Sequence, residues 1–180
     1  MGLLDFIFPK ECILCSRIGT DICDSCIKTF AHTLPSCPIC NKLSKEYITH
    51  LECSNNQIQF YTGWYLTKGL EYILLGKRDT HIYSLYLYLL RSLIQYLSID
   101  EIVNTSNLLP ILSIDKGDTE LNSFLVKHIH NRNCIKKDIL YIGWLQTSSN
   151  EYIEYMRRLP FGESSKVRFL ILFKTTPQKE

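Results

Sequence analysis

Four pairs of potential metal ligands, each with two residues between its members, lie within the first third of the chain. A C-x-x-C pair turns two sulfur atoms toward one point, and two pairs complete the tetrahedral coordination that Zn²⁺ prefers. Eight ligands therefore predict two closed zinc sites, which hold a fold together and leave no open position for a reacting water. The predicted ligands are Cys12, Cys15, Cys23, Cys26, Cys37, Cys40, His50 and Cys53.

These ligands can be paired in two ways. Consecutive pairing forms one site from the first two pairs and a second site from the last two, whereas a cross-braced arrangement joins the first pair to the third. We favour consecutive pairing because it closes short loops, and the entropy cost of closing a loop grows with its length. The alternative at the second site is that His50 is a surface histidine, because Asn56 stands where a C-x-x-C step from Cys53 would end.

A disulfide framework is the competing interpretation of these cysteines. The cluster holds seven cysteines, an odd number, and residues 1–9 have neither the basic leader nor the cleavage site of a secretory signal. In a reducing compartment, cysteines at this spacing are more often metal ligands than disulfides. We therefore expect a cytoplasmic zinc protein in which the eighth cysteine, Cys134, is a buried thiol.

Composition and charge narrow the classes of function. The 180 residues are 46% apolar with a formal net charge of +2. No apolar stretch reaches the roughly 18 residues that predict a membrane span. Residues 1–56 carry five basic and six acidic side chains, whereas residues 116–180 carry eleven and seven. Phosphate contacts need lysine and arginine, so the charge of the cysteine-rich segment does not favour nucleic acid.

The elements that position the ligands follow from the spacing of apolar residues. Apolar strands that alternate with helices predict an α/β fold, in which a parallel sheet is covered on both faces and flanked by helices. The expected strands are 58–66, 101–104, 109–112, 138–144 and 167–173, and the expected helices are 2–8, 24–32, 68–76, 80–97, 119–130 and 149–158.

Several motifs follow one another in a recognisable order. They are an Ile-Phe-Pro-Lys-x-Cys opening, the C-x-x-C pairs, a Thr-His-x-x-Cys closure at 49–53 and an aromatic strand with Tyr-Thr-Gly at 61–63. Over residues 5–95 this order resembles the ComF family of competence-associated proteins. The resemblance implies a double zinc ribbon at 1–56, a strand and helical linker at 57–97 and a type I phosphoribosyltransferase-like domain at 98–180.

The motif that would bind pyrophosphate in that family is altered here. The family places two adjacent acids and then Thr-Thr-Gly after an apolar strand; the acids hold ribose hydroxyls and the loop amides cradle phosphate. By this resemblance Thr175 and Thr176 are remnants of a cofactor-binding loop, but Ile171 and Leu172 occupy the acid positions and Pro177 the glycine position. Proline lacks an amide hydrogen and cannot supply the positive φ of a glycine.

A second family motif, Arg-Gly-Phe-Asn-Gln, corresponds here to Lys-Gly-Asp-Thr-Glu at 116–120, which keeps the glycine and one positive charge. The chain also runs only seven residues past the last predicted strand. We therefore expect a degenerate, truncated transferase-like domain without catalytic residues.

The resulting hypothesis is a ComF-like, non-catalytic binding module with two zinc ions. Its expected partner is single-stranded DNA or a DNA-uptake protein, and no small-molecule substrate is expected. Two alternatives stay open. One is a phosphoribosyltransferase that uses phosphoribosyl pyrophosphate and Mg²⁺, and the other is a module that docks on a protein partner.

Overall fold

The computed structural model divides the chain into two compact units, Met1–Ala31 and His32–Glu180. The division lies between the second and third cysteine pairs, so each unit holds one predicted zinc site. The domain limits predicted at residues 56 and 97 stay predictions. The structure describes residues 9–40, 42–53, 58–79, 83–111, 116–129, 138–146 and 167–175.

The first unit consists of tight turns and one short helix. An antiparallel bridge joins Glu11 to Ile18. The backbone then turns at Gly19, whose φ of 126° lies in a region that side chains with a Cβ rarely adopt. Helix α2 (Asp24–Ile27) follows and is shorter than the predicted helix at 24–32.

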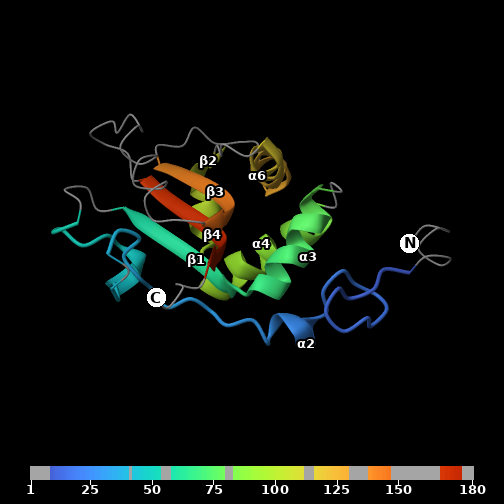
Figure 1. The fold of residues 1–180 in the computed structure, drawn as a ribbon. Helices are drawn as coiled ribbons and strands as arrows, with labels where there is room; N and C mark the ends of the chain where they lie inside the picture. The colour runs from blue at the N-terminus through green and yellow to red at the C-terminus, as the bar shows by residue number, and fades with distance from the viewer. Residues whose placement is uncertain are drawn as a thin grey trace. The chain divides into compact units, whose positions relative to one another are not determined.

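The second unit is an α/β fold. Its elements are η1 (Lys45–Tyr47), β1 (Gln59–Leu66), α3 (Lys68–Asp79), α4 (Ser84–Leu97), α5 (Asp100–Thr105), β2 (Ser106–Pro110), α6 (Lys116–Ile129), β3 (Asp138–Gln146) and β4 (Val167–Thr175). The four strands form a sheet in the order β1-β4-β3-β2, and every neighbouring pair is parallel. Figure 1 shows α3, α4 and α6 together on one side of this sheet.

Apolar side chains fill both faces of the sheet. On the helix-covered face, Trp144 of β3 meets Tyr86 of α4 edge-on, with ring centroids 5.6 Å apart. On the other face, Phe169 of β4 stacks between Phe60 and Tyr141, with both pairs of centroids 5.2 Å apart. Burial on both faces explains the nearly continuous apolar sequence of β4.

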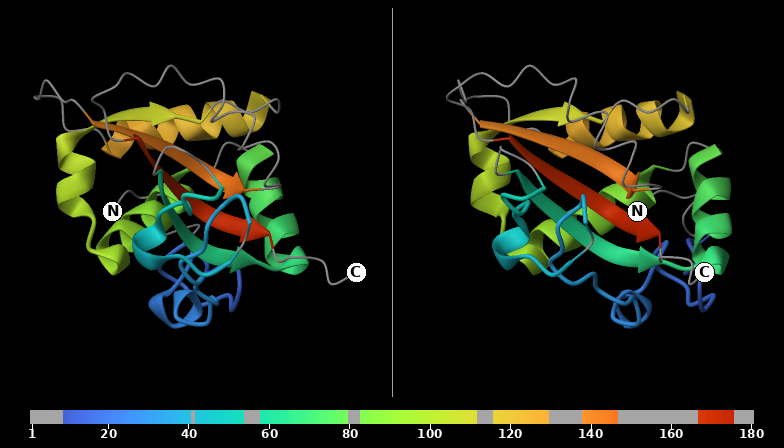
Figure 2. Two further views of the ribbon diagram at one scale, coloured as in Figure 1. Left: turned by 90° about the vertical axis from the view of Figure 1, so that its left-hand side faces the viewer. Right: turned by 60° about the vertical axis from the view of Figure 1, so that its left-hand side comes forward.

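The second ribbon, residues 32–53, closes the outer edge of β1. The backbone amide of Thr33 donates a hydrogen bond to the carbonyl oxygen of Gly63 at 2.9 Å. The backbone amide of Thr49 donates one to the carbonyl oxygen of Ile58 at 3.0 Å. Figure 2 shows this ribbon on the opposite side of the sheet from the helices. An edge strand otherwise presents unpaired backbone groups, so the ribbon both covers a face and completes an edge.

The α/β class and the parallel sheet are confirmed, with β1, β3, β4, α3, α4 and α6 within a few residues of their predicted limits. The strand predicted at 101–104 is wrong, because these residues belong to α5. Ile99 and Val103 are both buried, and their spacing of four places them on one face of a helix. The β-branched pair Ile102-Val103 suggested a strand from local preference alone. The next strand, β2, begins three residues before the predicted 109.

Parts of the sequence prediction fall outside the described residues: the helices at 2–8 and 149–158, and the residues Cys134, Thr176 and Pro177. Within the described ranges, no helix is both long and apolar enough to cross a membrane.

Gly63 offers a test of how tightly the sheet packs against α4. A Cβ at this position would lie 2.5 Å from the carbonyl oxygen of Leu172 and 2.8 Å from a methyl group of Leu93. We expect Gly63→Ala to lower the free energy of unfolding by about 1–3 kcal/mol, because the β4 backbone cannot withdraw. Urea denaturation measures this change.

The matched control is Gly69→Ala in α3, where an added Cβ meets nothing within 4 Å. Within a helix, alanine is more favourable than glycine by up to about 1 kcal/mol, so this control substitution should leave the stability unchanged or raise it. Equal effects of the two substitutions would contradict the close packing at Gly63.

Candidate metal centres

The first metal centre gathers four cysteines of the first unit: Cys12, Cys15, Cys23 and Cys26. Their sulfur atoms all lie within 4.8 Å of one another. Cys15 Sγ and Cys23 Sγ are 3.7 Å apart. A tetrahedron with Zn–S bonds of about 2.3 Å has corners about 3.8 Å apart, so this spacing fits zinc.

Backbone amides prepare Cys12 as a thiolate. The amide of Cys23 lies 3.5 Å from Cys12 Sγ and donates to it. Burial raises the pKa of the Cys12 thiol, but backbone amides led by that of Cys23 outweigh burial and lower the pKa to about 6. The thiolate is the form that binds metal, so the fold of these turns favours the ligand state.

The second metal centre gathers Cys37, Cys40, His50 and Cys53 from the second ribbon, again with ligand atoms within 4.8 Å of one another. His50 Nδ1 lies 3.3 Å from Cys40 Sγ, and His50 Nε2 lies 3.0 Å from the carbonyl oxygen of Leu43. A carbonyl only accepts, so Nε2 carries the hydrogen and the free Nδ1 lone pair faces the sulfurs.

The second centre also prepares a buried thiolate. The Cys37 residue has 0% of its surface exposed. Burial raises the pKa of the Cys37 thiol, but backbone amides led by that of Cys40 lower it to about 7. Each centre thus holds four soft or borderline ligands and fits a structural zinc ion.

The geometry confirms the consecutive pairing of the ligands. The structure brings together every predicted metal ligand, His50 included, in two groups that follow chain order. Residues 3–55 match the double zinc ribbon domain family. The match contains all eight ligands and ends before the α/β fold begins, so it characterises the ribbon and not the sheet. Comparison with curated proteins and with solved structures finds no significant match for the chain.

Of the positions aligned with a pyrophosphate loop, the described ones lie in β4. Thr175 is the last residue of the strand and pairs with Leu66 of β1. Ile171 and Leu172, at the positions of the family's two acids, are both 0% exposed. Apolar side chains at these positions fill the core on both faces of the sheet.

The segment 116–120 forms the first turns of α6, and Asp118, one of its two acidic residues, has structural partners. The Asp118 carboxylate accepts a hydrogen bond from Trp144 Nε1 at 2.6 Å and forms an ion pair with Arg78. Arg78 in turn lies over the Trp144 ring. The segment therefore joins α3, α6 and β3 through a half-buried charge pair.

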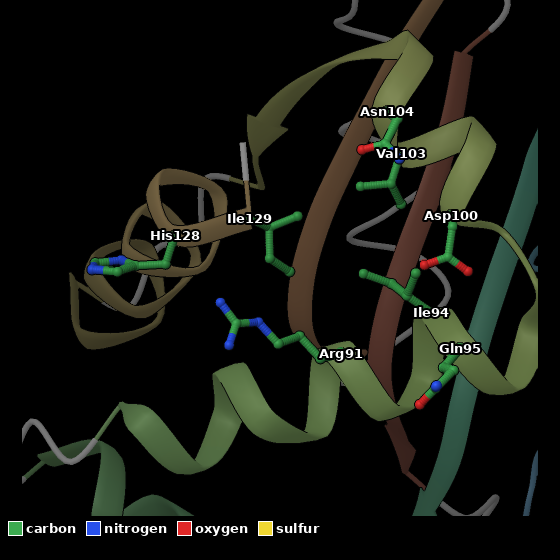
Figure 3. Close-up of a pocket in the computed structure, with 8 residues that line it drawn as sticks. All are labelled: Arg91, Ile94, Gln95, Asp100, Val103, Asn104, His128 and Ile129. Carbon is green, nitrogen blue, oxygen red and sulfur yellow. The ribbon is translucent and has the colours of Figure 1, made fainter. Parts of the chain in front are cut away.

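A polar pocket of about 330 Å³ lies between α4, α5 and α6 (Figure 3). Arg91 extends from α4 toward His128 of α6, while Asp100 lies at the other end of the pocket. Since α5 leads directly into β2, the pocket lies at the amino end of that strand. Parallel sheets bind ligands outside the carboxyl ends of their strands, so this pocket is not placed like a transferase site.

Zinc content tests both centres. We expect two zinc ions per chain, and one ion after either Cys12→Ser with Cys15→Ser or Cys37→Ser with Cys40→Ser, because the ligand sets are separate. Elemental analysis of the purified proteins measures the zinc content. His50→Ala should also leave one ion, whereas Cys134→Ser, the matched cysteine control, should leave two. Loss of both ions from a single-centre variant would contradict two independent sites.

Proposed function

We propose that this protein is a zinc-stabilised, non-catalytic binding module of ComF type, associated with DNA uptake or nucleic-acid handling. The observation that carries the non-catalytic part is the complete burial of Ile171 and Leu172 in β4. The resemblance places two adjacent carboxylates there, and a ribose hydroxyl needs such acceptors. Each zinc centre already has four protein ligands, so neither offers an open position for a substrate or water.

The arrangement of parts supports the ComF assignment. A double zinc ribbon precedes an α/β unit with a parallel sheet, which is the order that the sequence resemblance implies. The altered pyrophosphate loop and the altered segment at 116–120 both favour a binding role over a catalysed transfer reaction. Lysine and aspartate in that segment belong to the structure of α6, where Asp118 pairs with Arg78.

Exposed leucines on the second ribbon favour a protein as the partner. Leu34, Leu43 and Leu51 are 62%, 71% and 68% exposed. Single exposed apolar residues are ordinary, but three exposed leucines on one short ribbon favour apolar contacts over contacts with phosphate. The same ribbon lacks the basic surplus that phosphate contacts need. We therefore place a DNA-uptake protein ahead of single-stranded DNA as the partner.

Fluorescence anisotropy with a labelled single-stranded oligonucleotide tests the nucleic-acid part. We expect weak binding that is detectable at low salt and lost at physiological salt, because the basic surplus lies in residues 116–180. Lys42→Glu with Lys45→Glu on the ribbon should leave this affinity unchanged. Absence of binding even at low salt would exclude DNA as a partner and leave the protein partner.

Isothermal titration calorimetry tests the transferase alternative. We expect no saturable binding of phosphoribosyl pyrophosphate in the presence of Mg²⁺, because the acids and the loop glycine are absent. The protein should carry its two zinc ions in this experiment, so that a negative result reflects a folded chain. Saturable binding would contradict the non-catalytic assignment and would relocate the pyrophosphate loop.

A further inference from the structure

The pocket between α4, α5 and α6 carries one positive and one negative side chain at opposite ends. Arg91 comes from α4 and Asp100 from α5 (Figure 3). Both residues are exposed, and within the described part of the chain neither has an ion-pair partner. The pocket volume of about 330 Å³ is at the lower end of the range for small-ligand sites. The pocket therefore presents two opposite charges that do not pair with each other directly.

The separation of these charges sets the length of a ligand that contacts both. Arg91 lies six residues before Leu97, the last residue of α4, and a helix rises about 1.5 Å per residue, which gives about 9 Å. Asp100 follows in the first turn of α5. The ammonium and carboxylate of a free α-amino acid are attached to one carbon and lie too close together. Three extended residues span about 10 Å, so a peptide of that length fits.

Between the two charges the pocket carries groups that suit a peptide backbone and its side chains. Gln95 and Asn104 end in carboxamides, which both donate and accept hydrogen bonds as a peptide group does. Ile94 and Val103 are each 6% exposed, and with Ile129 they supply apolar lining. Apolar lining with a few polar groups is typical of small-ligand sites.

The anionic end of a ligand depends on Arg91 and not on His128. His128 Nδ1 lies 2.8 Å from the carbonyl oxygen of Phe124, and the imidazole stacks on the Phe124 ring with centroids 3.9 Å apart. Figure 3 shows the imidazole directed away from Arg91. The guanidinium of Arg91 can donate two parallel hydrogen bonds to one carboxylate.

We propose that this pocket binds a peptide of about three residues with both termini free. The C-terminal carboxylate of the peptide pairs with Arg91, and its N-terminal ammonium pairs with Asp100. The negative end of α4 lies three residues before Asp100 and also favours a cation there. A ligand with one charge would leave the opposite side chain unpaired, whereas a zwitterion pairs with both. No covalent step is involved, so the site is independent of the function proposed above.

NMR titration of the zinc-loaded, full-length protein with alanyl-leucyl-alanine tests the proposal. We expect saturable shifts of amide signals in α4, α5 and α6, with a dissociation constant of about 0.1–1 mM. Amidation of the peptide's carboxylate, or acetylation of its ammonium group, should each weaken binding by about 2–5-fold, because each removes one solvent-exposed ion pair.

Two variants assign each terminus to its partner. Arg91→Gln should bind the free and the amidated peptide equally, and Asp100→Asn should bind the free and the acetylated peptide equally. The matched controls change the same charges at exposed neighbouring positions: Lys127→Gln in α6 and Glu101→Gln in α5. Both controls should keep the full preference for free termini. Circular dichroism checks that each variant is folded.

Absence of saturable shifts in the unaltered protein would overturn the proposal, as would equal binding of free and capped peptides. These two measurements need no variant, so the test holds even where a substitution prevents folding. Unchanged preference for the free carboxylate in the Arg91→Gln protein would place the peptide elsewhere and would also overturn the proposal.

Discussion

The hydrogen-bonded junction between the second ribbon and β1 is the constraint on which the second unit depends. Thr33 and Thr49 donate backbone hydrogen bonds to Gly63 within β1 and to Ile58 just before it. The ligands Cys37 and Cys40 lie between these two threonines in the chain, and His50 and Cys53 follow directly after them. Without this junction β1 would be an open edge, and the face that carries Phe60 and Phe169 would lose part of its cover. Metal binding and completion of the sheet are therefore parts of one folding event.

The two zinc centres play different roles because their units differ in size. The first unit, residues 1–31, is below the roughly 40 residues at which a chain commonly folds without metals or disulfides. Zinc there takes the place of a hydrophobic core. The second unit has an extensive core of its own. In that unit zinc fixes the conformation of the ribbon that covers the sheet. The sheet and its helices can fold on their own core, so zinc there determines the geometry of the ribbon.

The sequence was sufficient for the metal centres because ligand spacing is a local property. A C-x-x-C step and the later pair His50 and Cys53 define their geometry within a few residues, whatever the rest of the chain does. The junction could not be predicted in the same way. Thr33 is an ordinary polar residue in the sequence, and its partner Thr62 lies 29 positions away. The strand predicted at 101–104, which belongs to α5, has a different cause. The local preference of Ile102 and Val103 for a strand was given more weight than the helical spacing of the buried side chains.

The burial of β4 bears on the proposal that the α/β unit is a non-catalytic relative of a transferase domain. Ile171 and Leu172 point to opposite faces of the sheet, as neighbours in a strand do, and both are fully buried. Two carboxylates at these positions would enter apolar surroundings on both faces, where an unpaired charge is strongly destabilising. If β4 is the counterpart of the strand before a pyrophosphate loop, the acids were replaced together with the solvent access that they require. On that proposal the whole core, and not two residues alone, excludes a pair of acids from this part of β4.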